Sequence, residues 1–154
     1  MIEADSVRSA ARSVDDSVRS TERFVEEYIA LWRNPSLEGM AALVTADIEI
    51  KQPLSPDMHG RDEVLEEYRK LFKWIPGLHA EVEKWAANGD DLYIRKRVIA
   101  PLPGGEIRFA VIDEFHLRDG YADRCTTYFD SMPIYGKLAL KPGSWLPWVR
   151  SRLG

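Results

Sequence analysis

A single carboxylate interrupts an apolar row in the second half of the chain. The segment from Ile107 to Leu117 alternates like a β-strand, so every second side chain shares one face. On that face Asp113 stands among Phe109, Phe115 and aliphatic residues. A charge among apolar neighbours is costly unless it is paired or neutralised, and such costs are common at functional sites. Asp113 is therefore the first candidate for a catalytic residue, and Phe109 and Phe115 are candidates to line a ligand pocket.

The preceding predicted strand carries a matching cation, Lys96, in the apolar row from Leu92 to Ala100. Two interpretations are open. Lys96 and Asp113 could form a buried ion pair without chemistry. We favour the alternative, in which burial disfavours the Asp113 carboxylate and the long Lys96 side chain carries its ammonium toward the pocket mouth. That interpretation predicts a neutral Asp113 able to donate a hydrogen bond.

Other candidates lie on other predicted elements. Tyr28 and Trp32 share the apolar face of a helix, where Tyr28, taken alone, fits a core aromatic residue with its hydroxyl at the surface better than a site residue. Gln52 ends a short alternating segment, and Phe72 lies on the apolar side of a later helix. Asp130 lies near the end of the last predicted strand, and a β-bulge could turn it toward either face. We expect Tyr28 and Asp130 to be catalytic with Asp113, and Gln52, Lys96, Trp32 and Phe72 to contact substrate.

The hydrophobic pattern predicts helices first and an antiparallel meander afterwards, which indicates an α+β fold with the helices on one sheet face. One helix begins near Ser20, and Asn34-Pro35 ends it and starts a second that reaches Val44. The third helix runs to Pro76-Gly77. The predicted strands are 48–52, 78–86, 92–100, 107–117 and 121–132. Residues 1–19 are expected to form an arm, helical or disordered, ahead of one domain over 20–154 whose aromatic tail at 145–148 packs on its body.

Composition excludes several classes of function. The 154 residues carry a net charge of −4 without a basic stripe, which argues against nucleic acid as a partner. The apolar runs are too short to span a membrane, and the start does not resemble a signal peptide. Cys125 is the only cysteine, which fits a reducing cytoplasm. The three histidines are scattered, so we expect no metal site and no cofactor.

Several segments resemble a known family. They are Tyr28-Ile29-Ala30-Leu31-Trp32, Gln52-Pro53, Gly60-Arg61-Asp62, and Ile112-Asp113-Glu114-Phe115 ahead of Asp119-Gly120. From about Ser20 to Tyr135 the chain resembles the nuclear transport factor 2-like superfamily, and within it the SnoaL-like polyketide cyclases, ketosteroid isomerases and limonene-1,2-epoxide hydrolases. The resemblance implies a cone-shaped α+β roll of the cystatin-like type. In that roll, three helices cover the concave face of a curved, mostly antiparallel sheet and enclose an apolar pocket.

The resemblance implies three kinds of chemistry. In ketosteroid isomerases, a helix tyrosine and a strand aspartic acid form an oxyanion hole, and these positions fall on Tyr28 and Asp113. The isomerase base position is Gln52 here. In limonene epoxide hydrolases the base falls on Asp130, while the place of their Arg-x-Asp pair reads Arg95-Lys96-Arg97. SnoaL-like cyclases use a single aspartate as acid and base, a role open to Asp113 or Asp130.

These observations lead to one hypothesis and two alternatives. The chain is expected to be a cofactor-independent acid–base enzyme, a cyclase or isomerase, acting on a hydrophobic small molecule. The first alternative is an epoxide hydrolase with Asp130 as base and Lys96 or Asp113 as electrophile. The second is a non-catalytic module for ligand binding or oligomerisation.

The outer face of the predicted sheet suggests self-association. It mixes apolar with charged residues, namely Trp85, Tyr93, Ile99 and Ile112 with Glu81, Glu83, Arg95, Arg97 and His116. Such a surface suits a two-fold homodimer, as the family resemblance also implies. Light scattering at tens of micromolar should give the mass of a dimer, and a monomer mass would contradict this expectation.

Overall fold

The structure is a computed structural model that describes residues 20–140, with side chains described over residues 20–136. The expectations for the arm at 1–19 and the aromatic tail at 145–148 therefore fall outside the described residues.

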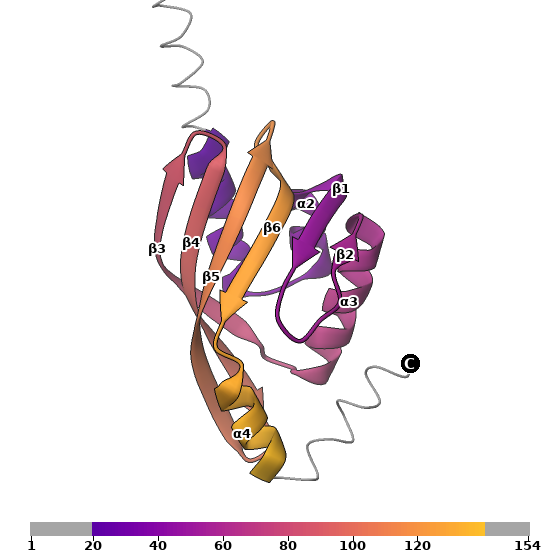
Figure 1. Cartoon of the computed structure of the whole chain (residues 1–154), viewed down its shortest axis with the longest axis vertical. Helices are drawn as coiled ribbons and strands as arrows, with labels where there is room; N and C mark the ends of the chain where they lie inside the picture. The colour runs from indigo at the N-terminus through magenta and orange to yellow at the C-terminus, as the bar shows by residue number, and fades with distance from the viewer. Residues whose placement is uncertain (1–19, 141–154) are drawn as a thin grey trace, which may run out of the picture.

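One curved sheet organises the described chain (Figure 1). Its strands, in spatial order, are β2 (Met58–His59), β1 (Val44–Lys51), β6 (Tyr121–Phe129), β5 (Gly105–Arg118), β4 (Asp91–Leu102) and β3 (His79–Asn88). Only the β1–β6 pairing is parallel among the pairs in this sheet. The predicted α+β class, with a curved and mostly antiparallel sheet, is confirmed.

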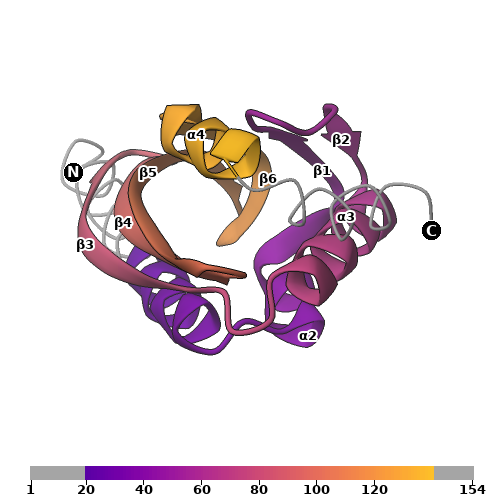
Figure 2. The same cartoon turned by 90° about the horizontal axis from the view of Figure 1, so that it is seen from below.

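Helices fill the concave side of this sheet, as Figure 2 shows. They are a helix over residues 20–33, α2 (Leu37–Leu43) and α3 (Arg61–Trp74), while α4 (Met132–Leu140) lies near one end of β5. Each of the first three presents an apolar face to the sheet, and Phe24, Met40 and Val64 belong to the buried core. Burial of these faces from water is the main force that holds the helices on the sheet.

The strand register sets the positions of the candidate residues. Lys96 of β4 pairs with Val111 of β5, and Ile94 pairs with Asp113. Lys96 and Asp113 are therefore diagonal neighbours on the inward face, a separation that a lysine side chain can bridge. On the other side of β5, Asp113 pairs directly with Thr127 of β6. Three neighbouring strands thus deliver polar side chains to one place.

Two predicted boundaries between the first helices and the first strand are wrong. Ser36, not Asn34, caps α2, because its Oγ accepts a hydrogen bond from Gly39 N at 3.0 Å. Pro35 therefore precedes the helix instead of opening it. Val44 was expected to end this helix but begins β1, where its backbone is already extended.

Two elements were not predicted. Between the predicted strand at 48–52 and the third helix, where no element was predicted, residues 58–59 form β2, in which exposed His59 pairs with Glu49. The last strand was expected to reach Met132 but ends at Phe129, and α4 follows it. The side chain of Asp130 accepts a hydrogen bond from Met132 N at 2.9 Å, which turns the chain away from the sheet.

The outer face of the sheet partly matches its prediction. Trp85, Tyr93 and Ile112 are exposed, each by more than 40% of its surface. Ile99 is only 2% exposed, so its expected place on the open outer face is wrong. Val98, Ile99 and Ala100 are consecutive and all buried, because both faces of β4 are covered at this point. No described helix has the length and apolar character needed to cross a membrane.

The tight turn between β5 and β6 depends on glycine. Gly120 has φ of 80°, and a Cβ there would come within 2.3 Å of Ser20 Oγ at the start of the first helix. Gly89 also has positive φ, but no atom lies within 4 Å of its ideal Cβ. Gly120→Ala should therefore lower the free energy of unfolding by about 1–3 kcal/mol, and by more than Gly89→Ala. Urea denaturation measures both, and equal losses would show that the approach of Ser20 has no energetic effect.

Candidate functional site

A cavity of about 330 Å³ opens inside the curve of the sheet. Most of its lining is aliphatic or aromatic, with contributions from Trp32, Tyr68, Trp74, Phe109 and Phe129. The inward rows of β4, β5 and β6 form one wall, and α3 contributes to another through Glu67, Tyr68, Lys70, Leu71 and Trp74. A cavity of this size and lining suits a small hydrophobic ligand.

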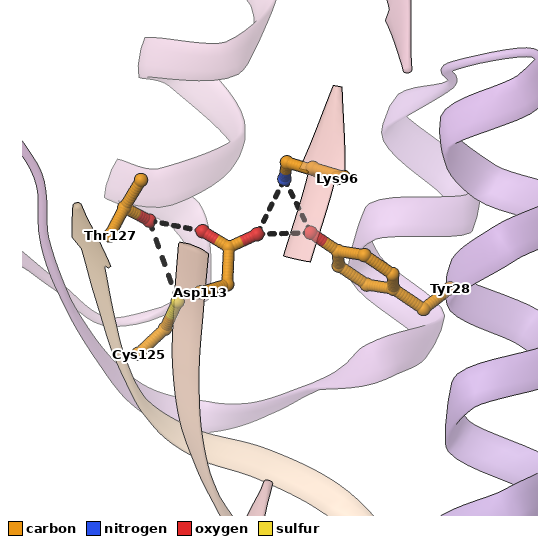
Figure 3. Close-up of polar contacts among 5 residues, drawn as sticks. All are labelled: Tyr28, Lys96, Asp113, Cys125 and Thr127. Carbon is orange, nitrogen blue, oxygen red and sulfur yellow. Dashed lines mark hydrogen bonds and ion pairs between the residues drawn. The ribbon is translucent and has the colours of Figure 1, made fainter. Parts of the chain in front are cut away.

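A buried ion pair lies in the wall of this cavity. Lys96 Nζ is 2.5 Å from Asp113 Oδ2, and the two side chains are 4% and 3% exposed. Tyr28 donates its hydroxyl proton to the same carboxylate oxygen, and Thr127 donates to Oδ1 at 2.6 Å. Figure 3 shows these contacts converging on Asp113 from a helix and two neighbouring strands. Three donors thus surround one buried carboxyl group, two of them at Oδ2 and one at Oδ1.

Lys96 is held in place by more than Asp113. Its ammonium also donates to Tyr28 Oη, and it lies 3.8 Å from the centre of the Trp32 ring and 5.0 Å from that of Tyr28. An ammonium over an aromatic face gains cation–π stabilisation. The prediction that Lys96 extends toward the pocket mouth is therefore wrong. The carboxylate and the two rings stabilise the ammonium inside the protein instead. The prediction of a neutral, hydrogen-bond-donating Asp113 depended on an ammonium at the pocket mouth and therefore loses its support.

Two groups beside the ion pair keep their protons. Burial, followed by the charge of Asp113, raises the pKa of Tyr28 well above its ordinary value. The pKa of the Cys125 thiol is raised for the same two reasons. Tyr28 therefore acts as a donor to Asp113 across the physiological pH range, and Cys125 is an unreactive, space-filling neighbour.

Some of the other sequence-derived candidates line the cavity, and others lie behind the ion pair. Gln52, Trp32 and Phe109 line the cavity beside Lys96 and Asp113. Tyr28 and Phe115 lie behind the ion pair, with ring centroids 5.4 Å apart, and border a much smaller void.

Phe72 and Asp130 are not among the lining residues. Phe72 packs against Tyr68 at the edge of the core, with ring centroids 5.8 Å apart. Asp130 is exposed and bonded to the start of α4. The expected catalytic role of Asp130 in this cavity therefore has no support from its position.

Sequence reasoning missed several lining residues. Thr127, which completes the shell around Asp113, belongs to the alternating row Cys125, Thr127 and Phe129. That row could have been found from the alternation, but its position opposite Asp113 required the register. Ile134 and Tyr135 were missed because α4 itself was not predicted.

The donor set of this site suits proton transfer and hydrogen bonding to a ligand oxygen. Across residues 20–136, no three or more His, Cys, Asp or Glu side chains are grouped so as to hold a metal ion.

The fold agrees with the comparison to protein families. Residues 25–124 match the family model described as the SnoaL-like domain. Because that match spans well over half of the chain, the protein belongs to the SnoaL-like family. No curated protein matches the chain at a significant level.

Solved structures show the same fold at low sequence identity. A candidate SnoaL-like polyketide cyclase from Jannaschia sp. superposes with a TM-score of 0.65 at 16% identity, covering 75% of this chain and 90% of that one. A protein of ketosteroid isomerase-like fold from Catenulispora acidiphila gives 0.66 at 17% identity, covering 71% and 87%. An LEH-like epoxide hydrolase from M. tuberculosis gives 0.66 at 16% identity, covering 83% and 96%. These likenesses concern the fold alone.

The buried pair should show strong energetic coupling. Lys96→Met leaves an unpaired carboxylate and Asp113→Leu an unpaired ammonium, so each should lower the free energy of unfolding by about 3–5 kcal/mol. The double variant should recover most of the loss, because no buried charge remains. Urea denaturation of the four proteins measures this cycle, and additive losses would contradict a direct Lys96–Asp113 interaction.

Proposed function

We propose that this protein is a cofactor-independent acid–base enzyme that moves a proton on a hydrophobic carbonyl compound, as a cyclase or isomerase does. The observation that carries the proposal is the Lys96–Asp113 pair, which combines a base and a cation in the wall of an otherwise mostly apolar cavity. Buried titratable pairs in clefts are typical of catalytic sites. Membership of the SnoaL-like family is consistent with this class of chemistry.

The hydrogen bonds of the proposed site support a role for each of its residues. Oδ2 of Asp113 accepts from Tyr28 and Lys96, whereas Oδ1 accepts from Thr127. A carboxylate oxygen can accept two hydrogen bonds, so Oδ1 retains capacity for a substrate proton. We assign Asp113 as the base and Tyr28 and Thr127 as residues that position it. Lys96 has three N–H groups and donates to Asp113 and Tyr28, which leaves one for the carbonyl oxygen of the substrate.

This assignment differs from an oxyanion hole built from Tyr28 and a neutral Asp113. The Tyr28 hydroxyl proton is committed to Asp113, so it is not available to a substrate oxygen. Lys96 takes that role, because an ammonium in a water-poor site stabilises developing negative charge strongly.

A ligand-binding module without catalysis is the second candidate. It is favoured by the number of donors on Asp113, since three hydrogen bonds from the protein already occupy its two carboxylate oxygens. The two candidates differ in one observable property, because only the enzyme exchanges a substrate proton with solvent.

Hydrogen exchange in deuterated water tests the proposal. A panel of hydrophobic ketones, such as tetralones and aryl alkyl ketones, is incubated with the protein, and deuterium at the carbon next to the carbonyl is followed by mass spectrometry. Asp113→Asn should lower the rate of exchange by about 10²–10⁴-fold, which is the usual contribution of a general base.

Two carboxylate variants control this experiment. Asp119→Asn makes the same chemical change in the exposed β5–β6 turn, where asparagine tolerates the positive φ of 55°, and should leave exchange unchanged. Asp130→Asn should also have no effect, whereas an epoxide hydrolase with Asp130 as base would lose activity toward epoxides. Binding of the ketones without exchange would overturn the enzymatic proposal and leave the binding module.

A further inference from the structure

Lys96 has an environment suited to covalent chemistry. It is the one lysine among the described side chains that is buried, and it lines the cavity. Lysines in mostly apolar cavities serve enzymes as nucleophiles toward carbonyl carbons when a neighbouring group can take the proton of the ammonium. We propose that Lys96 forms an imine with a hydrophobic aldehyde or unhindered ketone bound in this cavity.

The neighbours of Lys96 provide what this reaction needs. An amine must lose a proton before it attacks, and Asp113 Oδ2 lies 2.5 Å from Nζ to accept it. The departing hydroxyl must later gain a proton, and the same carboxyl group can return one. The aromatic rings of Trp32 and Tyr28 fix the amine against the cavity wall. Nucleophile, base and apolar binding space therefore lie together.

The step balances without any further reactant. The Lys96 ammonium gives a proton to Asp113, and the neutral amine attacks the carbonyl carbon, forming the C–N bond as the C=O π bond breaks. Transfer of the second amine proton to the oxygen yields a neutral carbinolamine. Protonation of its hydroxyl by Asp113 releases water and leaves a protonated imine. The net change is one carbonyl group and one ammonium converted to one iminium and one water.

The ion pair does not oppose formation of the product. The reactant pairs an ammonium with the Asp113 carboxylate, and the product pairs an iminium with the same carboxylate. Because the number and sign of buried charges are unchanged, the reaction adds no new cost of charge burial. An iminium makes the adjacent carbon more acidic, so the covalent step would assist the proton transfer proposed above. The imine inference rests on the proposed function only for the class of substrate.

Reductive trapping tests the inference. The full chain is incubated with trans-cinnamaldehyde and sodium cyanoborohydride, which reduces an iminium to a stable secondary amine. Intact mass spectrometry should show one reduced probe per chain. Peptide mapping of the treated protein without substitutions should place the probe on Lys96. Adducts distributed over the exposed lysines, with none on Lys96, would overturn the inference.

Matched variants sharpen the result. Lys96→Arg keeps a cation but cannot form an imine, so the specific adduct should be lost. Lys84→Arg makes the same change on an exposed lysine of β3 and should keep the adduct. Asp113→Asn should slow trapping while Lys96 stays the modified residue, because it removes the base and not the nucleophile. Peptide mapping of the unmutated protein decides the question even if Lys96→Arg fails to fold.

The trapping and exchange experiments fail independently. Exchange that depends on Asp113 without trapping at Lys96 would overturn the imine and keep Lys96 as a hydrogen-bond donor. Trapping at Lys96 without exchange on any ketone would support the imine and overturn the proton-transfer function.

Discussion

The burial of one ion pair is the constraint around which this protein is arranged. Lys96 and Asp113 lie on adjacent strands inside an apolar wall, where neither charge is tolerable alone. Asp113 also accepts hydrogen bonds from a hydroxyl of the first helix and a hydroxyl of β6, and Lys96 lies over the face of a tryptophan. The helix, three strands and the site they enclose are therefore mutually dependent, because moving any of them would expose an uncompensated charge to the apolar interior.

This constraint connects the stability of the protein to its chemistry. A fully apolar wall could have filled the same space at lower electrostatic cost, as replacements of buried ion pairs by hydrophobic residues indicate. The pair instead borders a cavity of about 330 Å³ that the surrounding side chains leave open. Polar groups that are costly for folding and face a ligand-sized space are best explained by their action on a ligand.

The site is also notable for the direction of its hydrogen bonds. Tyr28 and Thr127 both donate toward Asp113, and burial keeps the Tyr28 proton in place by raising its pKa. The two neutral hydroxyls thus fix the orientation of the carboxylate, and the Lys96 ammonium balances its charge. Chemistry at such a site depends on Asp113 Oδ1 and on the Lys96 amine, which are the atoms with remaining hydrogen-bonding or nucleophilic capacity.

The sequence alone determined the alternating rows of β4 and β5 and the isolation of Lys96 and Asp113 within them. Side-chain alternation is a local property of an extended backbone, so both faces can be assigned without a fold. The sequence also indicated the apolar helix face that bears Tyr28. Only the tertiary structure decided that Lys96 turns to Asp113, that Thr127 lies opposite, and that Asp130 lies in the turn before α4 and not in the cavity lining. Those outcomes depend on strand register and on contacts between distant segments, which no local pattern specifies.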